Sequence, residues 1–248
     1  MIEEMIDENL RKEAEASKRD RDCFHVSELS SCLRGVYLQR EGAKGEMTAR
    51  QLRIFEVGHM TEDFMIKHLG DRVKVKQAEV SYPEYDLKGS CDAIIEDDGP
   101  TLLECKSQHS RSFWWIEKRG GGAMEHHVQQ TALYWAKLKE EYPKLKAKVV
   151  YFSKDDLAMK EIMLTEGEMM KAYEGGIYQA ALLFNAWKDK VPPPPEPAIV
   201  MEDGKASVNW KAKYCPVHDR CLNDPFWLKK AEEKVESLNK GLKKGKAY

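Results

Sequence analysis

The spacing of apolar and polar residues divides the chain into helical and extended stretches. Apolar residues three or four positions apart are typical of a helix, and shorter apolar runs bounded by turn residues are typical of a strand. Helices are predicted at residues 1–22, 27–42, 48–69, 126–142 and 166–189. Strands are predicted at residues 73–82, 87–96, 101–107, 146–152 and 156–164.

Two of these helices carry more detailed expectations. Ser27 is the predicted N-cap of the second helix, because a serine side chain can accept a hydrogen bond from the first free backbone N–H groups. In the third helix, the expected core contacts lie at helical spacing; they are Leu52, Phe55, Met60 and Phe64.

The order of these elements predicts an α/β fold with a mixed central sheet of about four to five strands flanked by helices. Residues 1–24 are expected to form a charged N-terminal helix, and residues 25–190 the core. The stiff proline-rich linker 191–197 opens the last part, 191–248, whose cysteine-containing tail is expected to pack back on the core.

Charge and composition exclude some classes of protein. The 248 residues include 40 basic and 42 acidic side chains, giving a formal net charge of −2, so any nucleic-acid binding must use a local patch. No run of about 18 apolar residues predicts a membrane span, and the N-terminus lacks the apolar centre of a secretory signal. A cytoplasmic location is therefore expected, with cysteines that are free thiols or metal ligands.

Three charged residues on two neighbouring predicted strands stand out. Glu104 and Lys106 are two positions apart and point to the same face of one strand, and Asp92 on the preceding strand can approach that face. Two carboxylates held together repel each other, and burial makes each charge more costly. Carboxylate oxygens suit Mg²⁺ or Mn²⁺, which would neutralise both, and Lys106 could position or deprotonate a water molecule.

The combination Gly89-x-x-Asp92, a hairpin turn, and Glu104-x-Lys106 resembles the core motif of the PD-(D/E)XK nuclease superfamily. Gln130-x-x-x-Tyr134 resembles a motif of its RecB-like branch. The resemblance implies a restriction-endonuclease-like core and phosphodiester hydrolysis that depends on Mg²⁺ or Mn²⁺. The catalytic residues that it implies are Asp92, Glu104, Lys106, Gln130 and Tyr134.

The segment Gly58-His59-Met60-Thr61-Glu62 is similar to a further motif of this branch, in which a metal ligand follows a glycine on a helix. Many relatives have a histidine four residues after that glycine, whereas this chain has Glu62 there and His59 directly after the glycine. The implied metal ligands are Glu62, Asp92 and Glu104, with His59 as the alternative to Glu62.

Four cysteines lie outside the predicted strands. Members of the branch with an iron–sulfur cluster, including the CRISPR-associated adaptation exonuclease and the AddB-type nuclease domain, have one cysteine before the core and three after it, spaced C-x2-C-x5-C. Cys32 matches the first, and Cys215 and Cys221 match the last two, but Ala212 replaces the remaining ligand. Either His218 completes a Zn²⁺ site of three cysteines and one histidine, or Cys23 completes a four-cysteine [4Fe-4S] site.

A stretch that follows the strand carrying Lys106 mixes basic and aromatic residues. Basic side chains can hold phosphates while aromatic rings stack on bases. The predicted nucleic-acid-binding residues are Arg111, Trp114, Trp115, Lys118 and Arg119.

These features together predict a metal-dependent DNA nuclease, an exonuclease that acts on single strands or DNA ends. The resemblance implies a role in CRISPR adaptation or in phage or bacterial recombination, with protein partners from those processes. Two alternatives remain open from the residues: a structure-selective or restriction-like endonuclease, and a catalytically weak module that binds DNA ends.

Overall fold

The computed structural model describes residues 1–16, 21–45, 47–118, 122–202, 204–222 and 227–245. Within it the chain forms two compact units. The first unit comprises Met1–Ser30 and Met47–Ala181, and the second comprises Ser31–Glu46 and Leu182–Tyr248. Among the described helices, none is both long and apolar enough to cross a membrane.

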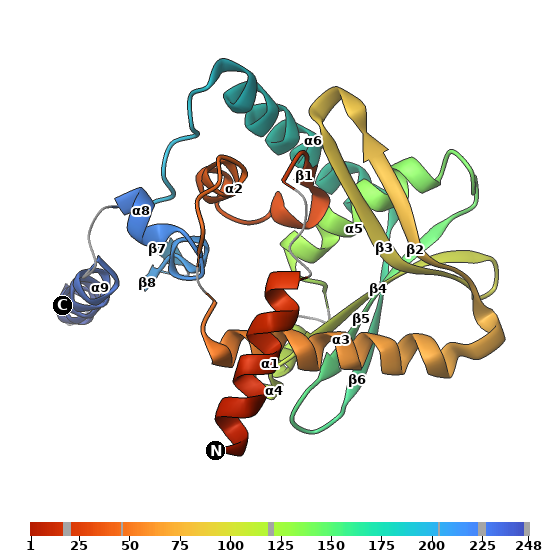
Figure 1. The fold of residues 1–248 in the computed structure, drawn as a ribbon, viewed down its shortest axis with the longest axis horizontal. Helices are drawn as coiled ribbons and strands as arrows, with labels where there is room; N and C mark the ends of the chain where they lie inside the picture. The colour runs from red at the N-terminus through yellow and green to blue at the C-terminus, as the bar shows by residue number, and fades with distance from the viewer. Residues whose placement is uncertain (17–20, 46, 119–121, 203, 223–226, 246–248) are drawn as a thin grey trace. The chain divides into compact units, whose positions relative to one another are not determined.

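The first unit is built on a mixed sheet, which confirms the predicted fold class (Figure 1). β3 pairs antiparallel with β2 and β4, β4 pairs parallel with β5, and β5 pairs antiparallel with β6. A two-residue strand, β1, adds a parallel contact to the start of β3. The six strands are β1 Phe24–His25, β2 Val73–Tyr82, β3 Leu87–Glu96, β4 Pro100–Gln108, β5 Lys146–Ser153 and β6 Met159–Leu164.

The prediction that Ser27 caps a helix is wrong. Ser27 lies in a single 3₁₀ turn, Val26–Glu28, directly after β1. The helix α2, Leu33–Arg40, begins later, and its N-cap is Cys32, whose thiol accepts a hydrogen bond from the Gly35 N–H. Phe24 and Val26 are buried, so side-chain packing decides the conformation here and overrides the capping preference of the serine.

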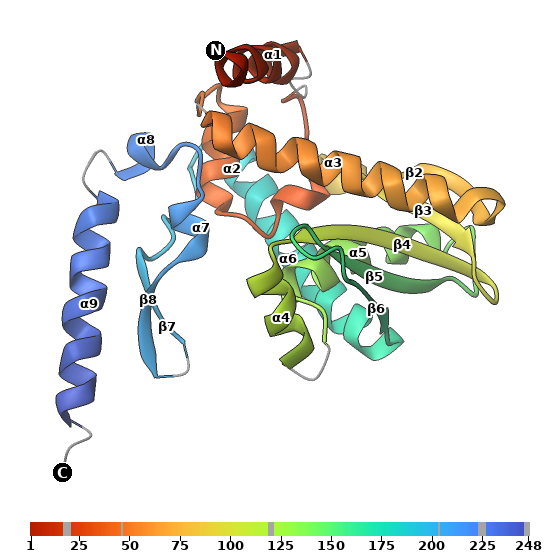
Figure 2. The same ribbon diagram turned by 90° about the horizontal axis from the view of Figure 1, so that it is seen from below.

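Helices cover both faces of the sheet, with α3 on one face and α5 on the other (Figure 2). Residues from α3, β3, β4 and β5 form the core between α3 and the sheet; they are Met65, Ile66, Ala93, Ile95, Leu103, Cys105 and Val150. The helices of the first unit are α1 Ile2–Ala16, α3 Ala49–Leu69, α4 Ser110–Lys118, α5 Glu125–Leu138 and α6 Glu166–Asp189, the last of which continues into the second unit.

The structure corrects the predicted inward face of α3. Leu52 is buried as expected, but Phe55, Met60 and Phe64 are exposed. The helix instead buries Thr61, Met65 and Ile66. Because α3 carries apolar residues on more than one face, their spacing predicts a helix without identifying the side that meets the sheet.

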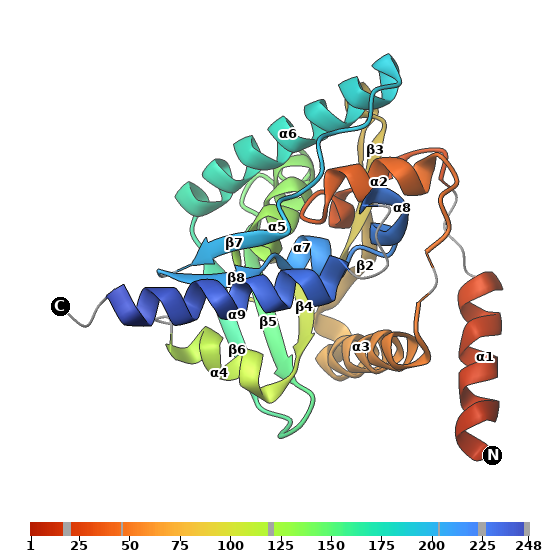
Figure 3. The ribbon, with the colours of Figure 1, turned by 90° about the vertical axis from the view of Figure 1, so that its left-hand side faces the viewer.

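The second unit combines α2 with the C-terminal part of the chain. The Arg34 guanidinium donates to the Pro193 carbonyl at 2.9 Å, so the proline-rich stretch packs within this unit. Helix α9, Trp227–Gly245, lies along strand β8, and the Asn239 amide exchanges two hydrogen bonds with the Ala206 backbone (Figure 3). The remaining elements are β7 Ile199–Glu202, β8 Lys205–Val208, α7 Trp210–Lys213 and α8 His218–Leu222.

Candidate active site

The three charged residues singled out in the sequence meet where two strands separate. The β3–β4 ladder runs from Glu96↔Pro100 to Ala93↔Leu103 and ends there. One step further along the same register, Asp92 and Glu104 face each other. Beyond this point β3 stays paired with β2, and β4 with β5, so the sheet opens into a fork (Figure 1). Asp92 lies on the β3 arm and Glu104 on the β4 arm.

The Asp92 carboxylate links the two arms, and a second charged contact lies within β4. Asp92 Oδ2 accepts a hydrogen bond from the Cys105 N–H at 2.6 Å, which uses a backbone donor that the ladder leaves unpaired. The Lys106 ammonium lies 2.6 Å from Glu104 Oε1. Glu104 is only 1% exposed, so this ion pair is largely shielded from water.

Helix α5 also contacts the Lys106 side chain. Lys106 Nζ donates to Gln130 Oε1 at 3.2 Å, and Gln130 Nε2 donates to the Tyr134 hydroxyl at 3.1 Å. An ammonium group can only donate, which fixes the orientation of the Gln130 amide. The buried Tyr134 ring approaches β3 closely because Gly89 lacks a side chain: a Cβ there would lie 2.9 Å from the ring.

Helix α3 contributes Glu62. Its Oε1 accepts a hydrogen bond from Gln77 Nε2 at 2.9 Å, and Ser90 Oγ donates to Gln77 Oε1 at 2.8 Å. His59, the alternative ligand, is 72% exposed, and its Nδ1 lies 4.0 Å from Glu56 Oε2. The structure thus places Glu62 in the electrostatic field of Glu104 and Lys106.

Burial and mutual repulsion alter the acidity of all three carboxyl groups. Burial, reinforced by the charge of Glu62, raises the pKa of Asp92 to about 6. Burial also raises the pKa of Glu104 to about 7, although the Lys106 charge opposes this. The pKa of Glu62 is raised by burial and then by Glu104. The site is therefore costly to charge fully without a cation.

Lys106 responds differently to the same surroundings. Burial favours its neutral amine, but the charge of Glu104 and the hydrogen bond to it outweigh burial, and the pKa of Lys106 is raised. The side chain is therefore an ammonium ion at neutral pH. This charge state suits a group that positions an anion or a water molecule better than one that removes a proton.

The donor set fits a divalent cation. Glu104 Oε2 is buried and lacks a hydrogen-bond partner among the described residues, an arrangement that costs free energy unless a cation meets it. Three carboxylates offer the oxygen ligands that Mg²⁺ and Mn²⁺ prefer. Within the described ranges, however, no three Asp, Glu, His or Cys side chains already stand close enough together to hold a metal ion.

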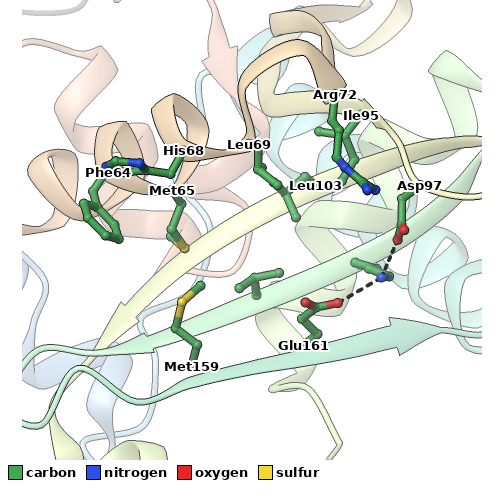
Figure 4. A pocket seen from close by; sticks show the side chains of 12 residues that line it. Phe64, Met65, His68, Leu69, Arg72, Ile95, Asp97, Leu103, Met159 and Glu161 are labelled. Carbon is green, nitrogen blue, oxygen red and sulfur yellow. Dashed lines mark hydrogen bonds and ion pairs between the residues drawn. The ribbon is translucent and has the colours of Figure 1, made fainter.

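A separate hollow of about 330 Å³ lies beside α3, against the face of the sheet that this helix covers (Figure 4). Its floor is apolar and includes Met65 and Leu103. The Lys148 ammonium at its edge pairs with Asp97 at 2.5 Å and with Glu161 at 2.9 Å. These charges already satisfy one another, so we assign no ligand to this hollow.

The predicted nucleic-acid-binding residues lie on and after α4. Trp114 and Trp115 are about half exposed, with ring centroids 5.2 Å apart, and Arg111 is exposed. Phe113 and Ile116 are buried and anchor the helix. Lys118 ends α4, and Arg119 lies outside the described residues.

In the second unit, Cys32, Cys215, Cys221 and His218 line one small hollow of about 10 Å³, together with Ala212 and Glu196. A hydrogen bond with Cys215 is the largest influence on Cys32 and lowers the pKa of its thiol. Gly35 allows this approach, because a Cβ there would lie 2.7 Å from Cys215 Sγ. Cys23 is a buried residue of the first unit and is not among the residues that line the hollow.

Sequence reasoning missed Gln77 and Ser90, which contact the side chain of Glu62 directly or through one intermediate. Gln77 belongs to no motif, Ser90 occupies an unspecified position of Gly89-x-x-Asp92, and neither residue type is unusual in a strand. A signal becomes visible only in the backbone, because Gln77 has a φ of +48°.

A family model of the PD-(D/E)XK nuclease superfamily matches residues 2–222. The crystal structure of SSO0001 has a TM-score of 0.52 and 20% identity, covering 91% of this chain and 96% of that one, which supports the shared fold. No curated protein sequence matches the chain.

An alkaline exonuclease, LHK-Exo from Laribacter hongkongensis, is a more distant structural neighbour. Its TM-score is 0.45 at 15% identity, covering 68% of this chain and 93% of that one. A second structure of the same exonuclease, in complex with dAMP, has a TM-score of 0.45 at 12% identity and covers the same shares of the two chains.

Proposed function

Because the chain belongs to the PD-(D/E)XK nuclease superfamily, we propose that it is a Mg²⁺- or Mn²⁺-dependent deoxyribonuclease that acts as an exonuclease on single strands or DNA ends. The observation that carries this proposal is the fork between β3 and β4. There Asp92, Glu104 and Lys106 converge, with an unpartnered carboxylate oxygen in a buried setting.

Each residue has a distinct part in the proposed reaction. Glu62, Asp92 and Glu104 would hold the divalent ion, which when bound lowers the pKa of water and neutralises phosphate charge. Lys106 is cationic, so its Nζ would stabilise the anionic phosphate and orient the attacking water. Gln130 and Tyr134 keep that ammonium in place through the hydrogen-bond chain from α5.

The exposed tryptophan pair supports a single-stranded substrate. Trp114 and Trp115 lie on α4, which begins four residues after Lys106. Unpaired bases can stack on exposed aromatic rings, whereas bases inside a duplex cannot. The proposed settings are CRISPR adaptation and phage or bacterial recombination, where such ends arise.

An assay on matched linear and circular single-stranded DNA tests the proposal. With Mn²⁺ we expect the linear strand to be degraded to mononucleotides or short oligonucleotides and the circular strand to stay intact. Without a divalent ion, neither should change. Cleavage of the circle would favour an endonuclease, and binding of ends without cleavage would favour the weak end-binding module.

We further propose a structural metal site in the second unit. Cys32, Cys215, Cys221 and His218 supply three sulfurs and one nitrogen, a donor set that suits tetrahedral Zn²⁺. His218 Nδ1 lies 2.7 Å from the Cys215 carbonyl oxygen, which can only accept, so Nδ1 carries a proton and the neutral ring would bind the metal through Nε2. A [4Fe-4S] cluster is the alternative, although Ala212 replaces one of its four cysteines.

Removing a ligand of this site should destabilise the protein. Cys32→Ser and Cys221→Ser are expected to lower the melting temperature by roughly 5 °C or more, because metal binding contributes directly to folding. Cys23→Ser, a buried thiol of the first unit, is the control and should have a smaller effect. Elemental analysis after anaerobic purification distinguishes zinc from iron. If neither metal is present and Cys32→Ser melts like the wild type, the site does not exist.

A further inference from the structure

Gln77 combines an unusual backbone conformation with a contact to a proposed metal ligand. It lies inside β2, yet its φ of +48° is in the left-handed region, which residues other than glycine rarely adopt. The β2–β3 register pairs Lys76 with Ala93 and Ala78 with Cys91. Gln77 therefore lies level with Asp92, beside the fork.

The side chain of Gln77 joins two elements of the site. Carboxylate oxygens only accept hydrogen bonds, so the amide nitrogen must face Glu62, and the amide oxygen then receives the Ser90 hydroxyl. Ser90 lies on β3, two residues before Asp92. The result is a chain of two hydrogen bonds from the strand that carries Asp92 to the helix that carries Glu62.

An unfavourable backbone conformation persists only where the surrounding structure enforces it, and such positions cluster at functional sites. Here the strained residue is the one whose amide holds Glu62. Metal ligands are commonly oriented by such hydrogen-bonded neighbours, whose loss weakens metal binding about 10- to 100-fold.

We propose that Gln77, anchored by Ser90, is a positioning residue that fixes the Glu62 carboxylate for binding of the divalent ion. This inference rests on the proposed function, because it requires Glu62 to be a metal ligand. It adds a residue outside the sequence motifs to the proposed site and assigns the backbone strain of β2 a role.

Substitution of Gln77 by glycine distinguishes the effect of the backbone conformation from the effect of the side-chain amide. Gln77→Gly removes the hydrogen bonds but favours a positive φ, so the metal-free protein should melt at the same temperature as the wild type or higher. Calorimetric titration with Mn²⁺ alone should nevertheless show binding about tenfold weaker. Ser90→Ala should weaken binding less, because the Gln77 amide loses its anchor but keeps Glu62.

Two comparisons make the result specific. Asp86 has a φ of +51° in the turn of the same β2–β3 hairpin, so Asp86→Gly relieves a similar conformation and should leave Mn²⁺ affinity unchanged. In a Glu62→Ala background, Gln77→Gly should have no further effect, because its action passes through Glu62.

The outcomes distinguish this inference from the proposed function. If the wild type and Glu62→Ala differ in Mn²⁺ affinity while Gln77→Gly binds like the wild type, only the inference on Gln77 fails. Additive losses in the double variant would also overturn it. If the wild type does not bind Mn²⁺, the proposed metal dependence fails, and the role of Gln77 fails with it.

Discussion

Asp92→Asn should raise the melting temperature of the metal-free protein at pH 8 and, in the same molecule, reduce nuclease activity at least about 10³-fold. The asparagine oxygen can still accept the Cys105 N–H, so the local fold is kept. A 10³-fold loss of rate corresponds to about 4 kcal/mol of transition-state stabilisation, which the variant loses with its charged ligand.

The gain in stability follows from the pKa of Asp92. Its folded-state pKa is about 6, above the ordinary value of 3.8, so the folded state binds this proton more tightly than the unfolded state. Ionisation therefore destabilises the fold progressively between about pH 4 and pH 6, and the full cost is present at pH 8. Melting curves should show Asp92→Asn more stable by about 6–12 °C at pH 8 and equal to the wild type near pH 4.

Asp97→Asn is a matched control whose effect on stability should have the opposite sign. The hydrogen bond and charge of Lys148 lower the pKa of Asp97, so its ionised form favours folding. This variant should lose stability above pH 4 and keep full nuclease activity. Asp92→Asn activity within about tenfold of the wild type would exclude Asp92 as an essential ligand.

Lys106→Met should reduce turnover at least about 10²-fold, while Mn²⁺ still binds. The ammonium group offers no lone pair to a metal ion, so its removal deletes the positive charge near the phosphate and the water but no metal ligand. Glu104 loses its 2.6 Å ion-pair partner and becomes a more available ligand. Calorimetry with Mn²⁺ should therefore show affinity equal to that of the wild type or higher.

Lys148→Met tests whether the effect is specific. The two lysines have similar exposure, 22% for Lys106 and 16% for Lys148, and both form ion pairs within the sheet. Lys148 lies at the separate hollow beside α3 and should be dispensable for cleavage. Loss of Mn²⁺ binding in Lys106→Met, as complete as in an Asp92 variant, would contradict a role confined to the reaction.

Local patterns predicted some parts of the fold well. β2, β3 and α6 begin and end at the predicted residues, because turn-forming residues bound both strands and continuous helical spacing defines the helix. β1 was missed because two residues are too few to show alternation. Its position depends on pairing with Leu87 and Lys88, which lie about 60 positions further along the chain.

The candidate site likewise has parts that sequence patterns predicted and parts that they missed. The spacing of Asp92, Glu104 and Lys106 predicts a shared face, and the structure brings them together at the fork. The direction in which α3 presents Glu62 depends on packing against the sheet, as does the contact with Gln77. A left-handed glutamine inside a strand leaves no trace in sequence spacing, so that part of the site becomes visible only in three dimensions.

The fork also bears on which divalent ion the site would select. β2 with β3 and β4 with β5 form two ribbons, joined on this side by the short ladder that ends at Ala93↔Leu103. The separation of Asp92 and Glu104 therefore depends on the angle between the ribbons. Mg²⁺ demands short, nearly octahedral coordination, whereas Ca²⁺ accepts longer and more variable distances. Ion preference would thus depend on the twist of the sheet as well as on the identity of the ligands.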